Sequence, residues 1–364
     1  MFPGVPSRRK VSADLEIMTG PGWRWGFYIL YFIKGIKMFS GKHRFCRFLM
    51  TGLAVVVVII TLGSLVQAQA PGFAQATNVT AAGVNRPAVV PDGFVVTPFG
   101  YFHPSCVMQL REGNTLLETG VQRADGIVEA VPVCQYPHFT ANGDMIFAGQ
   151  TRTIDPTIEG WLEYISVTTN SSYGAIQAGW IVPPLPKVND GQTLFFFPGL
   201  EDINNVQSIV QPVLQWYAPG PWAMASWNCC VQGEVWESTP IRVSPGDTVV
   251  GTIIPTCKEP AQYCPKWNVI SEDRTTGQKT TLAKTPANNQ IWNWAFGAVT
   301  EDYDVISCND FPANKSVTFV VRLYDQDRNV VGAPAWVGTP ANGGVQPWCG
   351  YNLKVTPTKE TVIY

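Results

Sequence analysis

Histidine is scarce in this sequence: three occur in 364 residues, and only His103 and His138 lie beyond residue 70. Triad-type serine and cysteine hydrolases need a histidine base, and no Gly-x-Ser-x-Gly motif is present. Cys-x-x-Cys, a common beginning of a zinc site, is absent too. These absences argue against triad hydrolysis and against zinc, and we expect neither a metal nor another cofactor.

Basic residues are scarce outside the N-terminus. Residues 1–50 hold nine of the 25 Lys and Arg and two of the 27 Asp and Glu, residues 51–70 hold no charge, and the remainder therefore carries a net charge of −9. An acidic body repels phosphate backbones, so no nucleic-acid partner is expected. It also suits a protein that works at low pH, where protonation reduces self-repulsion.

One long uncharged apolar run, Phe48–Val66, follows a basic stretch and is followed by small residues. This pattern predicts a secretory signal cleaved after Ala68, so that the mature chain begins at Gln69 and is extracellular. Residues 1–68 are then an N-terminal extension with a signal peptide, and Met38 is an alternative start to Met1. The run 48–66 is also long enough to span a bilayer. We therefore expect membrane contact only if this segment is retained as an anchor.

Eight cysteines follow the signal, and an even number in an exported chain is typical of disulfides. Spacing suggests two pairs: Cys257 with Cys264, which closes a short loop, and Cys106 with Cys134, which lies within one segment. The partners of the other four cysteines stay open.

No stretch beyond residue 70 shows the i, i+3, i+4, i+7 stripe of an amphipathic helix. Short apolar runs alternate instead with turn sequences such as Ser244–Asp247, which predicts an all-β sandwich or barrel. We expect a flexible linker over residues 69–92, a small disulfide-containing β segment over 93–155 and a β-sandwich domain over 156–364.

Glutamine is concentrated in one predicted strand. Gln207, Gln211 and Gln215 fall on one strand face, because side chains repeat every second residue. Such a face suits an open, water-lined cleft that binds a polar ligand; a solvated outer face without a role is the alternative. Four tryptophans are expected to line the same cleft: Trp222, Trp227, Trp292 and Trp294.

A glycosidase needs two carboxylates at a fixed separation. Glu234 and Glu237 have opposite strand parity, and Glu201 with Asp202 follows a Pro-Gly turn. The sequence therefore gives little support for a glycosidase.

Several segments stand in a distinctive order along the chain: Trp180-Ile-Val-Pro183, Phe195–Asp202, Val213-Leu-Gln215, Trp222–Trp227, Ser244–Val250, Thr275–Gln278 and Phe311–Phe319. In this order they resemble the glutamic endopeptidases, or eqolisins. The match covers Trp161–Thr356 and leaves residues 93–155 outside. The resemblance implies a concanavalin A-like, jelly-roll type sandwich of two antiparallel sheets.

The same resemblance assigns site residues. Gln215 falls on the family glutamine, which holds the oxyanion while a glutamate activates water. The glutamate position falls on Gly297. Glu301 lies four residues further along, about 13 Å away in a regular strand, and could substitute only through a bulge. The catalytic candidates are thus Gln215 and Glu301.

Three functions compete at this point. The first is a secreted peptidase-like sandwich that binds peptide or glycan in the cleft with weak or no catalysis. The second is an active acid endopeptidase of the glutamic type, which uses Gln215 and a nearby carboxylate. The third is a structural cell-surface protein.

Overall fold

The computed structural model describes residues 70–80, 83, 86–147, 160–206, 208–229 and 233–364. Residues Gln69–Tyr364 form one compact unit. The expected signal or anchor, Gln207 and Cys230 lie outside the described residues.

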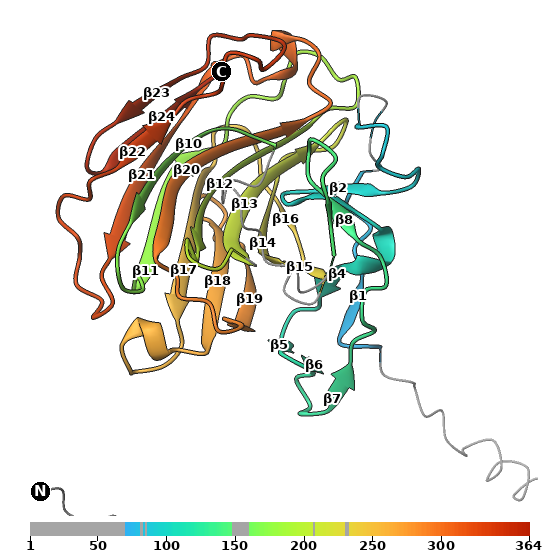
Figure 1. Ribbon diagram of the computed structural model, residues 1–364, viewed down its shortest axis with the longest axis vertical. Helices are drawn as coiled ribbons and strands as arrows, with labels where there is room; N and C mark the ends of the chain where they lie inside the picture. Colours follow the sequence, from blue (N-terminus) through green and yellow to red (C-terminus); the bar gives the residue numbers. More distant parts are fainter. Residues whose placement is uncertain (1–69, 81–82, 84–85, 148–159, 207, 230–232) are drawn as a thin grey trace, which may run out of the picture. The chain divides into compact units, whose positions relative to one another are not determined.

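The described chain is built from strands and a few short 3-10 helices, and its two large sheets lie against each other as curved layers (Figure 1). In the described residues the larger sheet has ten strands in the order β1-β4-β15-β14-β13-β12-β20-β10-β22, with β16 paired to β14. Its strands are β1 (Phe73–Gln75), β4 (Val107–Leu110), β10 (Trp161–Thr168), β12 (Thr193–Glu201), β13 (Ile209–Tyr217), β14 (Ala223–Cys229), β15 (Val235–Ser238), β16 (Ile241–Arg242), β20 (Trp294–Tyr303) and β22 (Val337–Thr339). All its pairings are antiparallel except that of β15 with β4.

The second sheet has seven antiparallel strands in the described residues, in the order β19-β18-β17-β11-β21-β24-β23. They are β11 (Ala175–Ile181), β17 (Thr248–Pro255), β18 (Lys266–Asp273), β19 (Lys279–Pro286), β21 (Ser316–Tyr324), β23 (Asn352–Val355) and β24 (Lys359–Ile363). The expected all-β sandwich of two antiparallel sheets is therefore confirmed.

Residues 73–147, which we call the cover, add two small sheets to this sandwich. The remaining strands of the cover are β2 (Val95–Thr97), β3 (Gly100–Phe102), β5 (Thr115–Leu117), β6 (Gly120–Gln122), β7 (Val128–Ala130), β8 (His138–Phe139) and β9 (Met145–Ile146). Three single-turn 3-10 helices complete the described elements: η1 (Pro104–Cys106), η2 (Ala261–Tyr263) and η3 (Cys308–Asp310).

The two large sheets differ in how many of their faces are buried. In β21 buried and exposed residues alternate, so one face packs on the core and the other meets water. In β12 every residue is buried, and in β13 all but the last. The central strands of the ten-stranded sheet are therefore covered on both faces.

Two separate hydrophobic clusters account for this double burial. One lies between the two large sheets and contains, for example, Phe196 and Phe319. The other lies on the opposite face of the ten-stranded sheet, where Phe195 and Phe197 pack with Phe94 and Phe102 of the cover. We call this second face the covered face; Figure 1 shows β2 and β8 beside it. Burial at roughly 25 cal/mol per Å² of apolar surface stabilises both interfaces.

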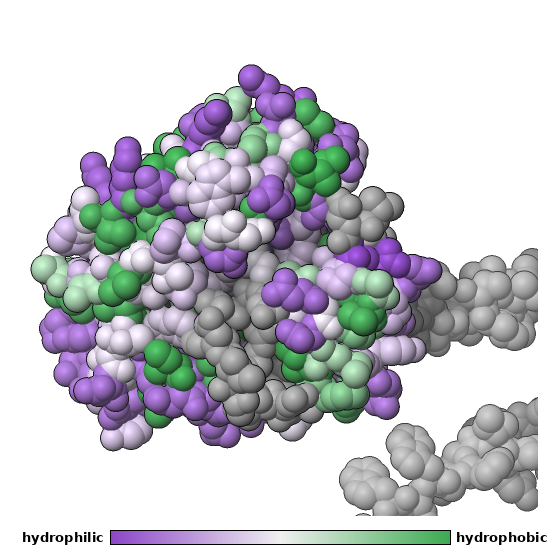
Figure 2. Space-filling model, turned by 45° about the horizontal axis from the view of Figure 1, so that its top comes forward, coloured by the Kyte–Doolittle hydropathy of each residue, from purple (hydrophilic) through white to green (hydrophobic). Residues whose placement is uncertain are grey.

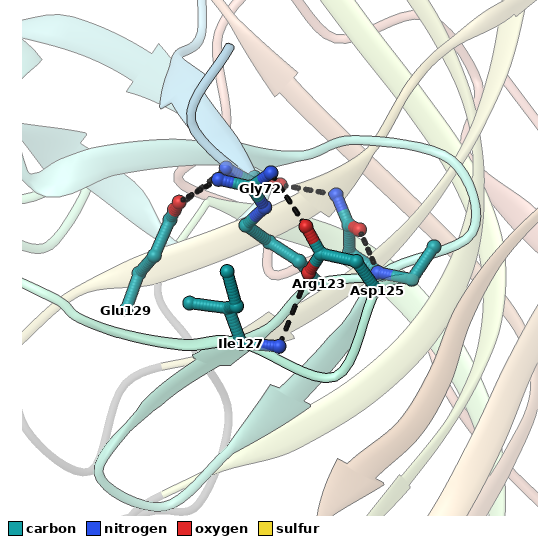
Figure 3. Close-up of polar contacts among 7 residues, drawn as sticks. Gly72, Arg123, Asp125, Ile127 and Glu129 are labelled. Carbon is teal, nitrogen blue, oxygen red and sulfur yellow. Dashed lines mark hydrogen bonds and ion pairs between the residues drawn. The ribbon is translucent and has the colours of Figure 1, made fainter. Parts of the chain in front are cut away.

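Polar contacts tie the first described residues to the β6–β7 hairpin (Figure 3). The Gly72 N–H donates to Glu129 Oε2 at 2.7 Å, and Asn114 Nδ2 donates to the Gly72 carbonyl at 2.8 Å. Arg123 pairs with Glu129 at 3.0 Å and with Asp125 at 2.7 Å. The Gly72 hydrogen bond and the Arg123 charge hold the pKa of Glu129 below its ordinary value. A side chain at residue 72 would come within 2.9 Å of Arg123 Cγ, so glycine allows this close approach.

Three disulfides join described residues: Cys106–Cys134, Cys257–Cys264 and Cys308–Cys349. The first two are the pairs that spacing suggested. Oxidised cysteines are typical of exported proteins.

None of the helices in the described parts of the chain has the length and apolar character needed to cross a membrane. Hydrophobic residues are scattered among hydrophilic ones on the face shown in Figure 2.

Candidate functional site

Gln211 and Gln215 lie on the covered face of β13, four residues apart, as their spacing predicted. Neither lines an open cleft: Gln211 is 0% exposed and Gln215 2%. Gln215 Oε1 accepts from Trp227 Nε1 at 2.9 Å, and this bond fixes which end of the amide is free to donate. The expected water-lined groove is filled by the cover, which corrects the sequence-based picture.

A carboxyl group that sequence reasoning set aside contacts Gln215. Glu237, on β15, is fully buried, and the Gln215 side chain is close enough to lower its pKa. It also accepts from Asn78 Nδ2 and from Gln109 Nε2, both at 3.1 Å. Burial raises the pKa of Glu237 to about 7, and these hydrogen bonds oppose the rise. The covered face therefore holds an amide and a carboxyl in direct contact.

Glu301 also lies on the covered face, and a bulge in β20 separates it from Gly297. In β20 the register with both neighbouring strands shifts between Phe296 and Ala298 or Val299, so Gly297 is an extra residue. Beyond the shift, Glu301 pairs with Phe195, which pairs with Gln215 on its other side. Directly paired residues share a face, so Gln215 and Glu301 flank Phe195 in one row, about 10 Å apart.

Glu301 is held by an aromatic group. Its Oε1 accepts from Tyr303 OH at 2.6 Å, while Oε2 has no hydrogen-bond partner among the described residues. Burial is the main reason that the pKa of Glu301 lies well above its ordinary range. Both carboxyls also act on Tyr217. Burial is the main reason that the pKa of its hydroxyl is raised, and the charges of Glu237 and Glu301 raise it further.

Gly297 points to the other side of the sheet. A Cβ built there would lie 2.0 Å from Glu360 Oε2 of β24, in the core between the large sheets. A side chain at residue 297 therefore could not face Gln215. The position that the resemblance assigned to a general base is filled by a carboxyl from the opposite sheet.

The four tryptophans divide between the two faces. Trp227 and Trp294 belong to the cluster on the covered face. Trp222 and Trp292 belong to the core between the sheets, where they are 0% and 1% exposed. The expectation that all four line one groove is wrong for Trp222 and Trp292, which lie just before β14 and β20 and pack into the core between the sheets.

The cover meets the covered face through a tight hairpin, residues 94–102, which we call the plug. Its two-residue turn is Pro98-Phe99, between Thr97 and Gly100 of β2 and β3. Gln211 Nε2 donates to the Pro98 carbonyl at 3.2 Å, and Tyr217 OH donates to the Val96 carbonyl at 3.4 Å.

Aromatic contacts complete the docking of the plug. Phe99 is 2% exposed and packs edge-on against Trp227, with ring centroids 6.1 Å apart. Tyr101 packs in the same manner on Tyr303 at 5.3 Å. The face thus binds two main-chain carbonyls and at least two aromatic side chains of a polypeptide, which here belongs to the same chain.

Glu237 is the residue that sequence reasoning missed. The sequence analysis compared Glu237 only with Glu234, which falls on the opposite face of the same strand. That comparison looks for two carboxyls on one strand and ignores neighbouring strands. A cross-strand search would have found it: β15 pairs with β14, and Glu237 stands opposite Trp227, which stands opposite Gln211.

Comparisons with known proteins give structural likeness only. No family model matches the chain, and no curated protein matches it. A solved structure of scytalidoglutamic peptidase with a peptide-based transition-state analogue is similar, with a TM-score of 0.42 and 16% identity. SCP-B, an eqolisin in complex with the tripeptide Ala-Ile-His, has the same TM-score and 17% identity; each match covers 56% of this chain and 98% of the other. Aspergilloglutamic peptidase from Aspergillus niger has a TM-score of 0.33 and 19% identity, over 48% of this chain and 99% of the other.

Proposed function

We propose that this protein is a secreted β-sandwich that binds polypeptide on the covered face and that the full-length chain is held in a self-occupied, latent form. The observation that carries the proposal is the docking of the plug: Gln211 and Tyr217 donate to main-chain carbonyls two residues apart. Carbonyls at that spacing occur in any polypeptide and not in a glycan. A peptide is therefore the better fit of the two ligand classes considered from the sequence.

A second function, acid peptide hydrolysis, is favoured by the contact between Gln215 and Glu237. In such a site Gln215 donates to the oxyanion, and the Glu237 carboxylate takes a proton from the attacking water. Under the cover, a pKa of about 7 keeps Glu237 protonated at acid pH, so it cannot act as a base. Removing the cover would hydrate the carboxyl and return its pKa toward the ordinary value near 4.3, which suits a base at acid pH.

Peptide binding is tested with a fluorescent peptide that carries the plug sequence of residues 94–102. The proteins are the full-length wild type and the Phe99→Ala variant, whose plug is weakened. We expect the variant to bind the peptide and the wild type not to bind it. A control peptide with alanine in place of the central phenylalanine should bind at least tenfold more weakly. Absence of binding to a variant whose plug amides exchange rapidly would refute the proposal.

Hydrolysis is tested in the same proteins with an unfolded protein substrate between pH 2 and 7. Cleavage by Phe99→Ala that is lost in Phe99→Ala/Glu237→Gln and in Phe99→Ala/Gln215→Ala would establish the second function. Peptide binding without cleavage would leave the first function as the sole activity of the face.

Export is tested by sequencing the N-terminus of secreted protein. We expect it to begin at Gln69, because Ala68 is the expected cleavage residue. A start upstream of residue 53 would instead mean that the apolar segment is kept as an anchor.

A further inference from the structure

The buried charged residues of the described chain are of one sign. Nine carboxyl residues are buried in it, whereas no buried lysine or arginine occurs there. The nine are Glu163, Glu201, Asp202, Glu234, Glu237, Asp273, Glu301, Asp310 and Glu360. An ionised carboxylate inside a protein is costly unless a cation or several hydrogen bonds compensate it. Several of these groups must therefore be accommodated in their neutral form.

Glu360 is the least compensated of these carboxyls. It is 0% exposed, and neither of its oxygens has a hydrogen-bond partner in the described structure. The carboxyl lies where a Cβ of Gly297 would be, so the glycine at the bulge of β20 makes the room that it occupies. β24 thus inserts a bare acid group between the two large sheets.

Among the described residues, no cation faces this group from the elements packed on it. From β10, Glu163 reaches β24, where its Oε1 accepts from the Ile363 N–H at 2.8 Å, while Oε2 has no partner among described residues. Tyr364 follows β24, and Tyr351 precedes β23; both are acids themselves. The inward residues of β20 and β21 near Glu360 are not ionisable. The basic residues of β21, β23 and β24 are exposed and point outward: Arg322, Lys354 and Lys359.

We propose that β24 is an acid-locked strand, which completes the seven-stranded sheet only while Glu360 is protonated and is released as the solution becomes neutral to alkaline. Burial raises the pKa of both carboxyls beside β24: that of Glu163 to about 8, and that of Glu360 well above its ordinary value. β24 lies between β21 and the edge strand β23, so its release breaks two strand pairings of the described sheet. The lock does not depend on the proposed function, because Glu360 faces away from Gln215.

The sign of the pH effect follows from linkage. Below about pH 4 the carboxyl is protonated in both states and contributes nothing to pH dependence. Between the unfolded pKa and the raised folded pKa, only the unfolded chain loses the proton. The folding equilibrium constant then falls tenfold per pH unit for each such group. Stability is therefore greatest in acid and declines toward neutral pH.

The test uses the full oxidised chain as wild type and as the Glu360→Gln variant. Unfolding by urea is measured from pH 4 to 8.5, together with hydrogen exchange of the β24 amides. Wild type should lose stability as pH rises, and β24 should exchange before β17 and β18. Glu360→Gln keeps a neutral group of the same size. It should reduce the fall of the folding equilibrium constant with pH by a factor of about ten per pH unit.

Glu272→Gln is the matched control, because Glu272 lies on β18 of the same sheet and pairs with Arg274 at 3.0 Å near the surface. The Glu272→Gln variant should lose stability with rising pH as steeply as wild type. Should Glu360→Gln fold poorly, Glu360→Ala serves instead, since the slope and not the absolute stability is diagnostic. Parallel pH curves for wild type and either Glu360 variant, or β24 exchange only through global unfolding, would overturn the proposal.

Discussion

Truncating the tip of the plug tests how firmly the cover holds the covered face. Phe99 is 2% exposed, packs against Trp227 and belongs to the cluster that joins cover and sheet. Phe→Ala substitutions in cores typically cost ~3–5 kcal/mol, and an aromatic pair contributes ~0.5–1.5 kcal/mol beyond its buried area. We expect Phe99→Ala to lower the free energy of unfolding by about 3–4 kcal/mol, because the tip of a hairpin can relax more than a strand interior.

Urea unfolding at pH 5 measures this loss, and hydrogen exchange of residues 94–102 locates it. Exchange in the plug should accelerate at least a hundredfold, while the amides of β17 and β18 follow the global stability. Tyr263→Ala is the control, because Tyr263 is 70% exposed and its loss should change stability by less than about 0.5 kcal/mol. A Phe99→Ala cost below about 1 kcal/mol would show that the plug is only loosely docked, and the latent form would have no physical basis.

Three further substitutions test the buried groups. Between pH 4.5 and 7 only the unfolded chain ionises residue 237, so wild type should lose about 3 kcal/mol of unfolding free energy, and Glu237→Gln should remove this loss. Urea unfolding at several pH values measures the effect, and an unchanged curve would refute the raised pKa. Gly297→Glu should destabilise the fold by more than about 3 kcal/mol and give no proteolysis, because the new side chain collides with Glu360; a stable, active variant would reverse the assigned orientation of residue 297. Replacing Cys106 and Cys134 by serine should cost ~2–5 kcal/mol in thermal unfolding and speed exchange in the cover, whereas a loss confined to the seven-stranded sheet would contradict this placement of the disulfide.

Strands β13 and β20 show where sequence periodicity succeeds and where it fails. Period two places Gln211 and Gln215 together correctly, because β13 is regular there. It fails for Gly297 and Glu301, because one extra residue in β20 turns every later side chain to the other face. Nothing in the local sequence reports the bulge; the space beside Gly297 is defined by Glu360, which lies 63 residues away along the chain.

The sequence by itself determined the fold class, the two short-range disulfides and the shared face of Gln211 and Gln215. Each of these depends on local chemistry: turn residues between short apolar runs, small loop lengths between cysteines and strand parity. The tertiary structure alone decided that this face is covered, that Glu237 is the carboxyl beside Gln215 and that Glu360 lies bare in the core. These properties depend on which distant strands become neighbours. The single-sequence pattern does not encode that pairing, because every strand edge presents the same main-chain donors and acceptors.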